Sequence, residues 1–259
     1  MLVQFTVQNF KSIKKPATLD LQATAFSEHR NTLLRSPAGD LLLPLSVIYG
    51  PNGGGKSNVL EAIGALVRKV VVPIYMATHT VGSMPGYPSA PIMPFVFDPH
   101  TKNEPSTFEV FFQTGLAEYR YCLHTKEEKV VYERLDRVKF STKKQSGLFE
   151  RDSNGLKMIG DFRSLKVTRD LSSTMPVLSF LGMTYENDEI VNDVLNWFKT
   201  KIAVIDYGKP QQELLVSIAN SEQARKLVLS MMQEMDLDIV DYRTEERPNH
   251  RLAVFTKHR

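Results

Sequence analysis

The 259-residue sequence is poor in cysteine and has no long hydrophobic run. Its one cysteine, Cys122, cannot form an internal disulfide, which argues against a disulfide-stapled secreted domain and favours a reducing cytoplasm. No stretch approaches the roughly 18 apolar residues of a membrane span. The first residues alternate in polarity, which is typical of a strand and not of a signal peptide. We therefore expect a cytoplasmic protein with no membrane partner.

Several catalytic and metal-binding patterns are also missing. The six histidines are scattered, without the i, i+4 spacing or the paired cysteines that build a zinc site. No Gly-x-Ser-x-Gly nucleophile motif occurs. The net charge of +3 is too small to indicate a nucleic-acid partner by itself. Apolar residues make up 42% and charged residues 24%, which is ordinary for a folded domain of this length.

One informative motif is present, and it lies between an apolar run and a helical pattern. Gly50 to Ser57 reads GPNGGGKS, which fits the phosphate-loop pattern G-x-x-x-x-G-K-[ST]. Before it, LSVIY at Leu45 to Tyr49 predicts a buried strand. After it, apolar residues recur at three- and four-residue spacing up to Val70, which predicts an amphipathic helix beginning near Ser57. We predict nucleotide contacts from Asn52, Gly53, Gly54, Gly55, Lys56, Ser57 and Asn58.

Each residue type in this loop suits a phosphate ligand. Glycines let the backbone wrap closely round phosphate oxygens, and the start of the helix adds unpaired N–H groups. Lys56 would supply a positive charge to the β- and γ-phosphates, and the Ser57 hydroxyl would be a ligand of Mg²⁺. The base-reading [NT]-K-x-D motif of GTPases is absent, which argues against a GTPase, and the loop itself predicts a nucleotide with Mg²⁺.

The rest of the chain predicts a mixed α/β protein. Alternation predicts two strands before the loop and an antiparallel meander of three or more strands after it. Prolines predict that the first helix ends before Pro73 and that a loop covers 73–105; the polar stretch 141–170 also suggests a loop. The predicted strands are 3–7, 19–23, 107–112, 118–123, 130–135, 202–206, 238–243 and 252–256, and the later helices are 188–199 and 211–235.

The N-terminal motifs resemble a known group of ATPases. A strand containing V-x-N-F-K-S-I at Val7 to Ile13 precedes a phosphate loop that continues as N-x-L-E-A-I at Asn58 to Ile63. This arrangement resembles the ABC-type ATPases of the RecF, SMC and OLD group, and is most similar to the stand-alone anti-phage ATPases of the RloA/AbiL-like and PARIS AriA type. The resemblance is specific over residues 1–70 and looser over 95–150.

The resemblance carries implications for fold and site. It implies an α/β P-loop NTPase of ABC-ATPase type, with an N-terminal antiparallel β-subdomain and an inserted β-meander flanking the nucleotide-binding core. It makes Lys11 and Asn31 candidates for phosphate or ribose contact, against the alternative of solvated residues. We expect an ATP-binding lobe over 1–170 and a mixed α/β second lobe over 171–259, incomplete at its C-terminus.

Two motifs of that group are not found. Its members hydrolyse ATP between two heads, using an S-G-G-like signature and an acidic strand, the Walker B strand, that ends in D-E. Leu171 to Thr174, LSST, is a poor substitute for the signature, and Ile202 to Asp206 is the best candidate for the acidic strand. We expect the motifs to lie in sequence beyond residue 259; a split ATPase and a degenerate nucleotide-binding module are the alternatives.

The resemblance also implies a function. We expect an ATPase that forms a homodimer or a higher homo-oligomer and controls an effector, a nuclease in kind, in anti-phage defence. The alternatives are a non-hydrolysing, nucleotide-dependent scaffold that holds a partner protein, and a RecF-like DNA-repair ATPase that contacts nucleic acid.

Overall fold

The computed structural model of the chain describes residues 1–25, 28–78, 91–167, 171–205, 222–234, 238–247 and 251–258. The described residues fall into two compact units, one that ends at residue 204 and one that begins at residue 205. Asp206, part of the predicted 73–105 loop and the first half of the predicted helix 211–235 lie outside the described ranges. The domain division at residue 170 stays a prediction.

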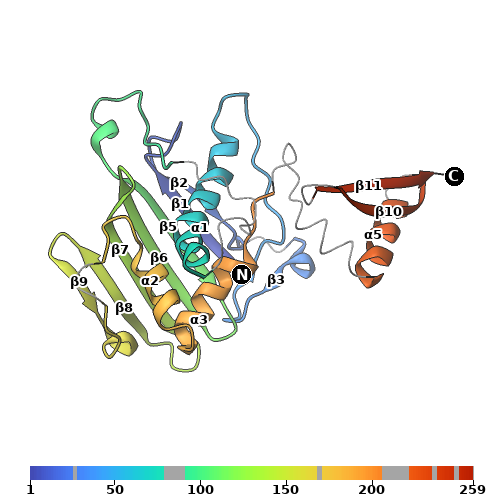
Figure 1. The fold of residues 1–259 in the computed structure, drawn as a ribbon. Coiled ribbons are helices and arrows are strands. Elements are labelled where there is room, and N and C mark those ends of the chain that lie inside the picture. Colours follow the sequence, from blue (N-terminus) through green and yellow to red (C-terminus); the bar gives the residue numbers. More distant parts are fainter. Residues whose placement is uncertain are drawn as a thin grey trace. The chain divides into compact units, whose positions relative to one another are not determined.

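The first unit is built on a seven-stranded antiparallel sheet with the order β2-β1-β5-β6-β7-β8-β9 (Figure 1). Alternation decides which face of each strand is buried, as in β1, where Val3, Phe5 and Val7 are all buried. The predicted N-terminal strands and meander are confirmed. The sheet comprises β1 (Leu2–Gln8), β2 (Ala17–Asp20), β5 (Ser106–Gln113), β6 (Ala117–Lys126), β7 (Lys129–Lys139), β8 (Gln145–Asp152) and β9 (Gly155–Met158), and β3 (Leu34–Arg35) pairs separately with β4 (Leu41–Leu42).

Helices pack on one face of this sheet and bury it. Side chains of α1 and α2 join those of the strands in a single hydrophobic core (Figure 1). Trp197, after α3, stacks on Phe112 of β5 with ring centroids 4.1 Å apart. Stacked and edge-on aromatic pairs of this kind stabilise a core beyond the area they bury. The helices are α1 (Lys56–Thr78), α2 (Val177–Thr184) and α3 (Glu189–Asn196), followed by the π-helical turn η5 (Trp197–Lys201), and the short 3₁₀ turns are η1 (Arg30–Thr32), η3 (Thr101–Asn103) and η4 (Gly160–Phe162).

Helix α1 continues through Pro73, so the prediction that it ends before this proline is wrong. A proline inside a helix removes one backbone hydrogen bond and typically costs about 3 kcal/mol. Val70, Val71 and Ile74 are buried around it, and this burial offsets the cost. The buried Ser179 hydroxyl of α2 also donates to the Val70 carbonyl oxygen at 2.7 Å, on the turn where the helix ladder is interrupted.

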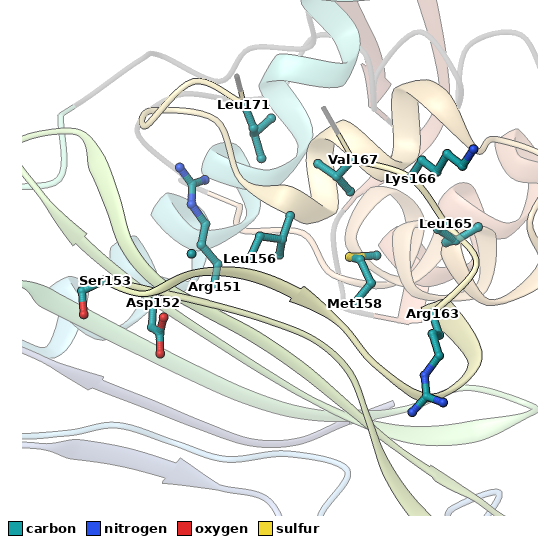
Figure 2. Close-up of a pocket in the computed structure, with 11 residues that line it drawn as sticks. Arg151, Asp152, Ser153, Leu156, Met158, Arg163, Leu165, Lys166, Val167 and Leu171 are labelled. Atoms are coloured by element: carbon teal, nitrogen blue, oxygen red, sulfur yellow. The ribbon is translucent and has the colours of Figure 1, made fainter. Parts of the chain in front are cut away.

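The stretch 141–170, predicted as a polar loop, contains the hairpin β8–β9 and the turn η4. The alternation of β8 was missed because the register between β7 and β8 is irregular: Leu135 pairs with Phe149, but Asp136 pairs with Gly147. The extra residue, Leu148, is buried beside Phe149, and two consecutive buried residues conceal the period of two. The side chains of the hairpin that face the core also line an open pocket (Figure 2).

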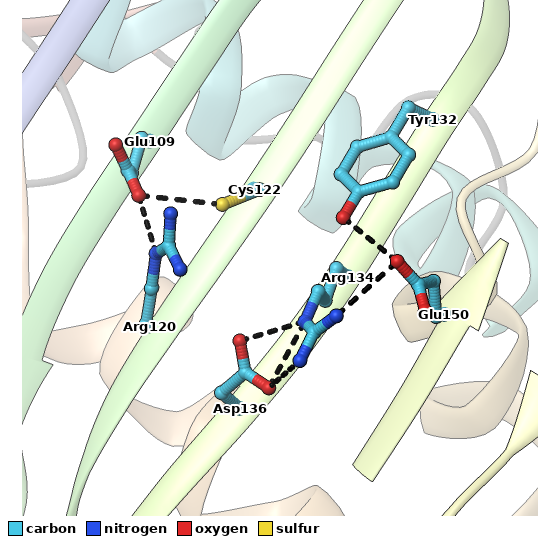
Figure 3. A network of polar contacts seen from close by, with 7 residues as sticks. All are labelled: Glu109, Arg120, Cys122, Tyr132, Arg134, Asp136 and Glu150. Atoms are coloured by element: carbon cyan, nitrogen blue, oxygen red, sulfur yellow. Dashed lines mark hydrogen bonds and ion pairs between the residues drawn. The ribbon is translucent and has the colours of Figure 1, made fainter. Parts of the chain in front are cut away.

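The opposite face of the sheet carries a polar network (Figure 3). Arg134 of β7 bonds Asp136 at 2.9 Å and Glu150 of β8 at 3.2 Å. On β5 and β6, Glu109 pairs with Arg120 and accepts a 3.5 Å hydrogen bond from the Cys122 thiol. Burial raises the pKa of Cys122 to about 12, so the thiol stays protonated at neutral pH. A buried, protonated thiol is a poor nucleophile, so Cys122 serves as a small residue of the strand.

The predicted buried strand at residues 45–49 is wrong. These residues form no strand, and Leu45, Val47 and Tyr49 are 75%, 70% and 90% exposed. The chain runs beside the segment that follows β2 as far as Leu43, whose N–H donates to the Leu21 carbonyl oxygen at 2.7 Å. A buried strand needs neighbours on both sides, and no described strand lies beside 45–49.

Asn9, in the turn after β1, ties this turn to the segment before β5. Asn9 is 2% exposed, and its backbone adopts the left-handed conformation, with φ of 54°. Its amide nitrogen donates to the carbonyl oxygens of Thr101 at 2.8 Å and Glu104 at 3.0 Å, and its amide oxygen accepts from the Phe95 N–H at 2.9 Å. One buried side chain therefore fixes two separate segments of chain.

Replacing Asn9 with alanine is expected to lower the free energy of unfolding by about 2 kcal/mol, because backbone groups that it bonds would be left unpaired in a buried place. Urea denaturation of the two proteins measures the difference. Gln8→Ala, one residue earlier on β1, is the matched control and should change stability by less than about 0.5 kcal/mol. Equal losses in both variants would contradict the role of Asn9.

The second unit contains α5 (Glu222–Glu234), β10 (Ile239–Arg247) and β11 (Arg251–His258). The strands form an antiparallel pair, which confirms the predicted terminal strands, and α5 is the described part of the predicted helix. Arg225 of α5 bonds Asp241 at 2.6 Å and lies over the Tyr242 ring. Among the described residues of the whole chain, no helix is long and apolar enough to cross a membrane.

Candidate functional site

Residues 50–55 form a glycine-rich loop that leads directly into α1. Gly53 and Gly55 have φ of 78° and 86°, a region that side chains other than glycine adopt at a cost. A turn closes inside the loop, where the Gly54 N–H donates to the Pro51 carbonyl oxygen at 3.2 Å. The predicted helix start is confirmed, since α1 begins at Lys56. The glycines therefore allow a tight loop that ends at the N-terminus of a 23-residue helix.

The Lys56 side chain folds back over this loop. Its ammonium group donates to the carbonyl oxygens of Gly50 at 2.9 Å and Pro51 at 2.8 Å. The first amides of a helix have no partner within the helix, and the helix dipole makes this end electropositive. Ser57, the next residue, is exposed. A phosphate group would thus meet an ammonium, helix amides and a hydroxyl within three consecutive residues.

The turn between β1 and β2 lies against the start of α1. Reciprocal backbone hydrogen bonds between Phe10 and Ile13, at 2.9 and 2.8 Å, close this turn. The Asn58 amide donates to the Ser12 hydroxyl at 2.6 Å, and Lys11 forms an ion pair with Glu61. Because Asn58 and Glu61 are three residues apart, they lie on the same face of the helix. This turn therefore fixes the first helical turn after the loop.

The structure brings together most of the predicted site residues. The loop residues, Lys56, Ser57 and Asn58 are contiguous, and Lys11 reaches α1 through Glu61. Asn31 lies in the short turn η1, and among the described residues no hydrogen bond or ion pair joins it to the loop. The roles of Lys11 and Asn31 toward a ligand stay predictions.

Two partners in this site, Ser12 and Glu61, were not assigned from the sequence. The sequence did contain a signal for Glu61, because Asn58 and Glu61 have the i, i+3 spacing of residues on one helix face. The sequence does not show which segment faces them. That contact depends on the tertiary arrangement that places the β1–β2 turn beside α1.

The acidic strand expected of an ATPase is not found in the described residues. Residues 202–205 form no strand, which corrects the prediction of a strand there. Ser172 and Thr174 of the LSST segment bond each other at 2.9 Å, and the Ser173 carbonyl oxygen accepts from the Val130 N–H of β7. No cluster of three or more metal-ligating side chains occurs in the part of the chain that the structure describes. The role of Ser57 as a ligand of Mg²⁺ stays a prediction.

A Cβ atom at Gly55 would lie 2.8 Å from the Ser12 hydroxyl oxygen, so the loop and the β1–β2 turn approach as closely as glycine permits. We expect Gly55→Ala to weaken ATP binding about tenfold, because this contact and the unfavourable φ together cost roughly 1–2 kcal/mol. Equilibrium dialysis with radiolabelled ATP measures the dissociation constant.

The control for this experiment is Gly115→Ala, in the turn between β5 and β6. A Cβ atom at Gly115 would have no other atom within 4 Å, so the same substitution is expected to leave binding unchanged. Equal affinity of the Gly55→Ala variant and the original chain would show that the loop does not need this geometry.

Comparison with known proteins agrees with the loop geometry. Residues 45–171, just under half of the chain, match the model of a family described as "AAA domain, putative AbiEii toxin, Type IV TA system". A search of curated proteins found no match. The matched range contains the loop, α1 and the sheet from β5 to β9. Together the match and the loop support the assignment of this chain to a P-loop ATPase-like family.

Proposed function

We propose that this chain is an ATP-binding and ATP-hydrolysing subunit of the ABC type that works in the cytoplasm. The observation that carries the proposal is the loop at residues 50–55, with left-handed glycines, an overlying Lys56 and the start of α1. The triphosphate would lie along the loop amides, where Lys56 would exchange its two carbonyl acceptors for phosphate oxygens. Such charge-assisted hydrogen bonds are stronger than those to neutral carbonyl groups.

The site fits Mg²⁺ as well as nucleotide. Ser57 lies in the first turn of α1 with an exposed side chain, next to Lys56, as a hydroxyl ligand of nucleotide-bound Mg²⁺ requires. When bound, the ion supplies positive charge that neutralises the phosphate oxygens. The chain's own residues would position the nucleotide, and the β1–β2 turn would hold the helix start in place through Ser12.

We further propose that two chains come together around the nucleotide and control an effector. The resemblance to two-headed ATPases supports this, since in those proteins each head completes the other's site. The printed description of the matching family names a putative toxin of a toxin–antitoxin system. We infer from both that a toxic effector of the nuclease type is the controlled partner and that anti-phage defence is the setting.

A second candidate function is a scaffold that binds nucleotide without hydrolysing it. The segment 45–49, which leads into the phosphate loop, favours this candidate. It is exposed and has no neighbouring strand among the described residues, so no such strand brings an acidic residue beside the loop. In this case ATP would order an assembly through binding alone. Dissociation of nucleotide would then be the release step.

Steady-state ATP hydrolysis at increasing chain concentration tests the first proposal against the second. Two heads that complete each other's sites predict a rate per chain that rises with concentration and is lost in Lys56→Ala. Binding without hydrolysis at every concentration would favour the scaffold. A rate per chain that is constant from low concentration upward would contradict the two-headed arrangement.

A further inference from the structure

A pocket of about 720 Å³ opens between β9 and residues 163–167 and 171 (Figure 2). It lies at the β9 end of the sheet, whereas the phosphate loop lies against the turn between β1 and β2, at the other end. Five strand spacings of about 4.8 Å separate β1 from β9, which is roughly 24 Å. The pocket is therefore distinct from the candidate nucleotide site.

The floor of the pocket is aliphatic. Leu156 and Met158 of β9 face Leu165, Val167 and Leu171, and all five side chains are half-buried against the core. Aromatic side chains are absent from its described lining. Binding sites for single-stranded nucleic acid stack bases on aromatic rings, so this floor suits aliphatic side chains better than bases.

The surroundings of the pocket are positively charged. The Arg151 guanidinium donates to the carbonyl oxygens of Met175 at 2.9 Å and Ser172 at 3.3 Å, which fixes the side chain, and its charge acts on Glu133, its cross-strand neighbour on β7. Arg163 and Lys166 also line the pocket, and none of these three cations forms an ion pair within the described ranges. Figure 2 shows the Asp152 carboxylate directed away from the aliphatic floor.

Asp152 does not cancel this charge, because its carboxylate is already bonded within the hairpin turn. It accepts from the Asn154 N–H at 2.7 Å and from the Asn154 side-chain amide at 3.2 Å. The pocket therefore combines an aliphatic floor with cations whose charge is available to an anionic ligand.

Strand β9 is the last strand of the sheet, so one side of its backbone has no partner strand among the described residues. The Ile159 N–H donates to the Leu148 carbonyl oxygen of β8 at 2.8 Å. Peptide groups alternate between the two sides of an antiparallel strand, so those of Leu156 and Met158 face the free side. An exposed edge of this kind can accept a further strand.

We propose that the pocket binds an extended peptide segment of a partner protein, with alternating acidic and aliphatic residues. The peptide backbone pairs with the free edge of β9. Its aliphatic side chains enter the pocket over Leu156 and Met158. Because alternate side chains of a strand point to opposite faces, its carboxylates lie on the other side of the strand, where Figure 2 shows the Arg163 guanidinium, and Lys166 adds positive charge to the same segment. The binding needs no nucleotide and stands apart from the proposed ATPase function.

Fluorescence anisotropy with the whole chain and a labelled peptide of alternating glutamate and leucine tests the proposal. Arg163→Glu/Lys166→Glu is expected to weaken binding at least tenfold, since both side chains are exposed and their reversal leaves the core intact. Lys143→Glu/Lys144→Glu, the same charge change in the exposed turn between β7 and β8, should leave it unchanged. Lys56→Ala should also leave peptide binding unchanged.

Two further probes separate strand pairing from charge attraction. A peptide with lysine in place of glutamate should not bind, and one with a central proline should bind at least tenfold more weakly because proline cannot donate to the ladder. Equal binding of the proline peptide, an unchanged affinity of the Arg163→Glu/Lys166→Glu variant, or no binding at all would overturn the proposal. Tighter binding of a ten-nucleotide single-stranded DNA at the same site would overturn it in favour of nucleic acid.

Discussion

Replacing Lys56 with alanine is expected to weaken Mg²⁺–ATP binding about 100-fold. Its ammonium group lies over the loop and would bond two phosphate groups, and hydrogen bonds to charged groups contribute roughly 1.5–3 kcal/mol each. A loss of about 3 kcal/mol corresponds to two decades in the dissociation constant. Isothermal titration calorimetry with ATP measures the change directly.

The matched control is Lys144→Ala, which removes the same charge from the exposed turn between β7 and β8. It should bind ATP as the original chain does. AMP, which lacks the β- and γ-phosphates, should bind weakly to all three proteins. If the Lys56→Ala variant keeps its affinity for ATP, the loop is not the phosphate site.

The second large effect concerns Glu133, a fully buried carboxylate on β7. One of its oxygens accepts from the Val177 N–H at 2.6 Å, and the other accepts from the Leu178 N–H at 3.0 Å and the Tyr121 hydroxyl at 2.9 Å. The residue before α2, Pro176, offers no side-chain cap. Glu133 therefore caps α2 from a strand 44 residues earlier in the chain.

Glu133→Ala is expected to lower the free energy of unfolding by about 3 kcal/mol. Loss of a helix cap costs roughly 1 kcal/mol, and a buried donor left unpaired costs about 1–3 kcal/mol. Glu104→Ala, at an exposed side chain, is the control and should change stability by less than about 0.5 kcal/mol. Chemical denaturation at constant pH measures both variants.

The same residue makes stability depend on pH. Burial raises the pKa of Glu133 from 4.5 to about 7, while the hydrogen bonds that it accepts work in the opposite direction. Between these values the folded protein keeps a proton that the unfolded chain has released, so the contribution of Glu133 to stability is fully present below pH 4.5 and is lost as pH rises to about 7. From pH 5 to 7.5 this contribution decreases by about 2–3 kcal/mol.

Glu133→Gln removes the titrating group, so the free energy of unfolding of this variant should not show the decrease between pH 5 and 7.5. For each protein, the free energy of unfolding at pH 7.5 is subtracted from that at pH 5. This difference cancels any effect of the substitution that does not depend on pH. An identical pH dependence in both proteins would show that Glu133 does not titrate in this range.

Local signals in the sequence predicted the glycine-rich loop, the start of α1 and several strands. The phosphate loop and the start of α1 follow from a fixed residue spacing, and strands β1, β5, β6 and β7 follow from a period of two. Both signals are local. The link between Ser12 and Asn58 is not local, because it joins residues 46 positions apart through tertiary packing.

Helix α2 was not predicted from the sequence. It reads VLSFLGMT, which is apolar on almost every side and gives no helical period, because the helix is buried and contacts both β7 and α1. Two failed predictions also have physical causes. Pro73 is tolerated in α1 because its surroundings are buried. The segment 45–49 has the composition of a buried strand, but composition alone cannot supply neighbouring strands.

If ATP binds at the loop of residues 50–57 and the β1–β2 turn supports this loop, bound nucleotide should protect both segments. Amide hydrogen exchange followed by mass spectrometry, with and without Mg²⁺–ATP, measures this protection. We expect slower exchange in residues 50–58 and in the turn at 9–13, and no such change in Lys56→Ala. Saturating ATP that leaves exchange in both segments unaltered, or that protects only other parts of the chain, would contradict this expectation.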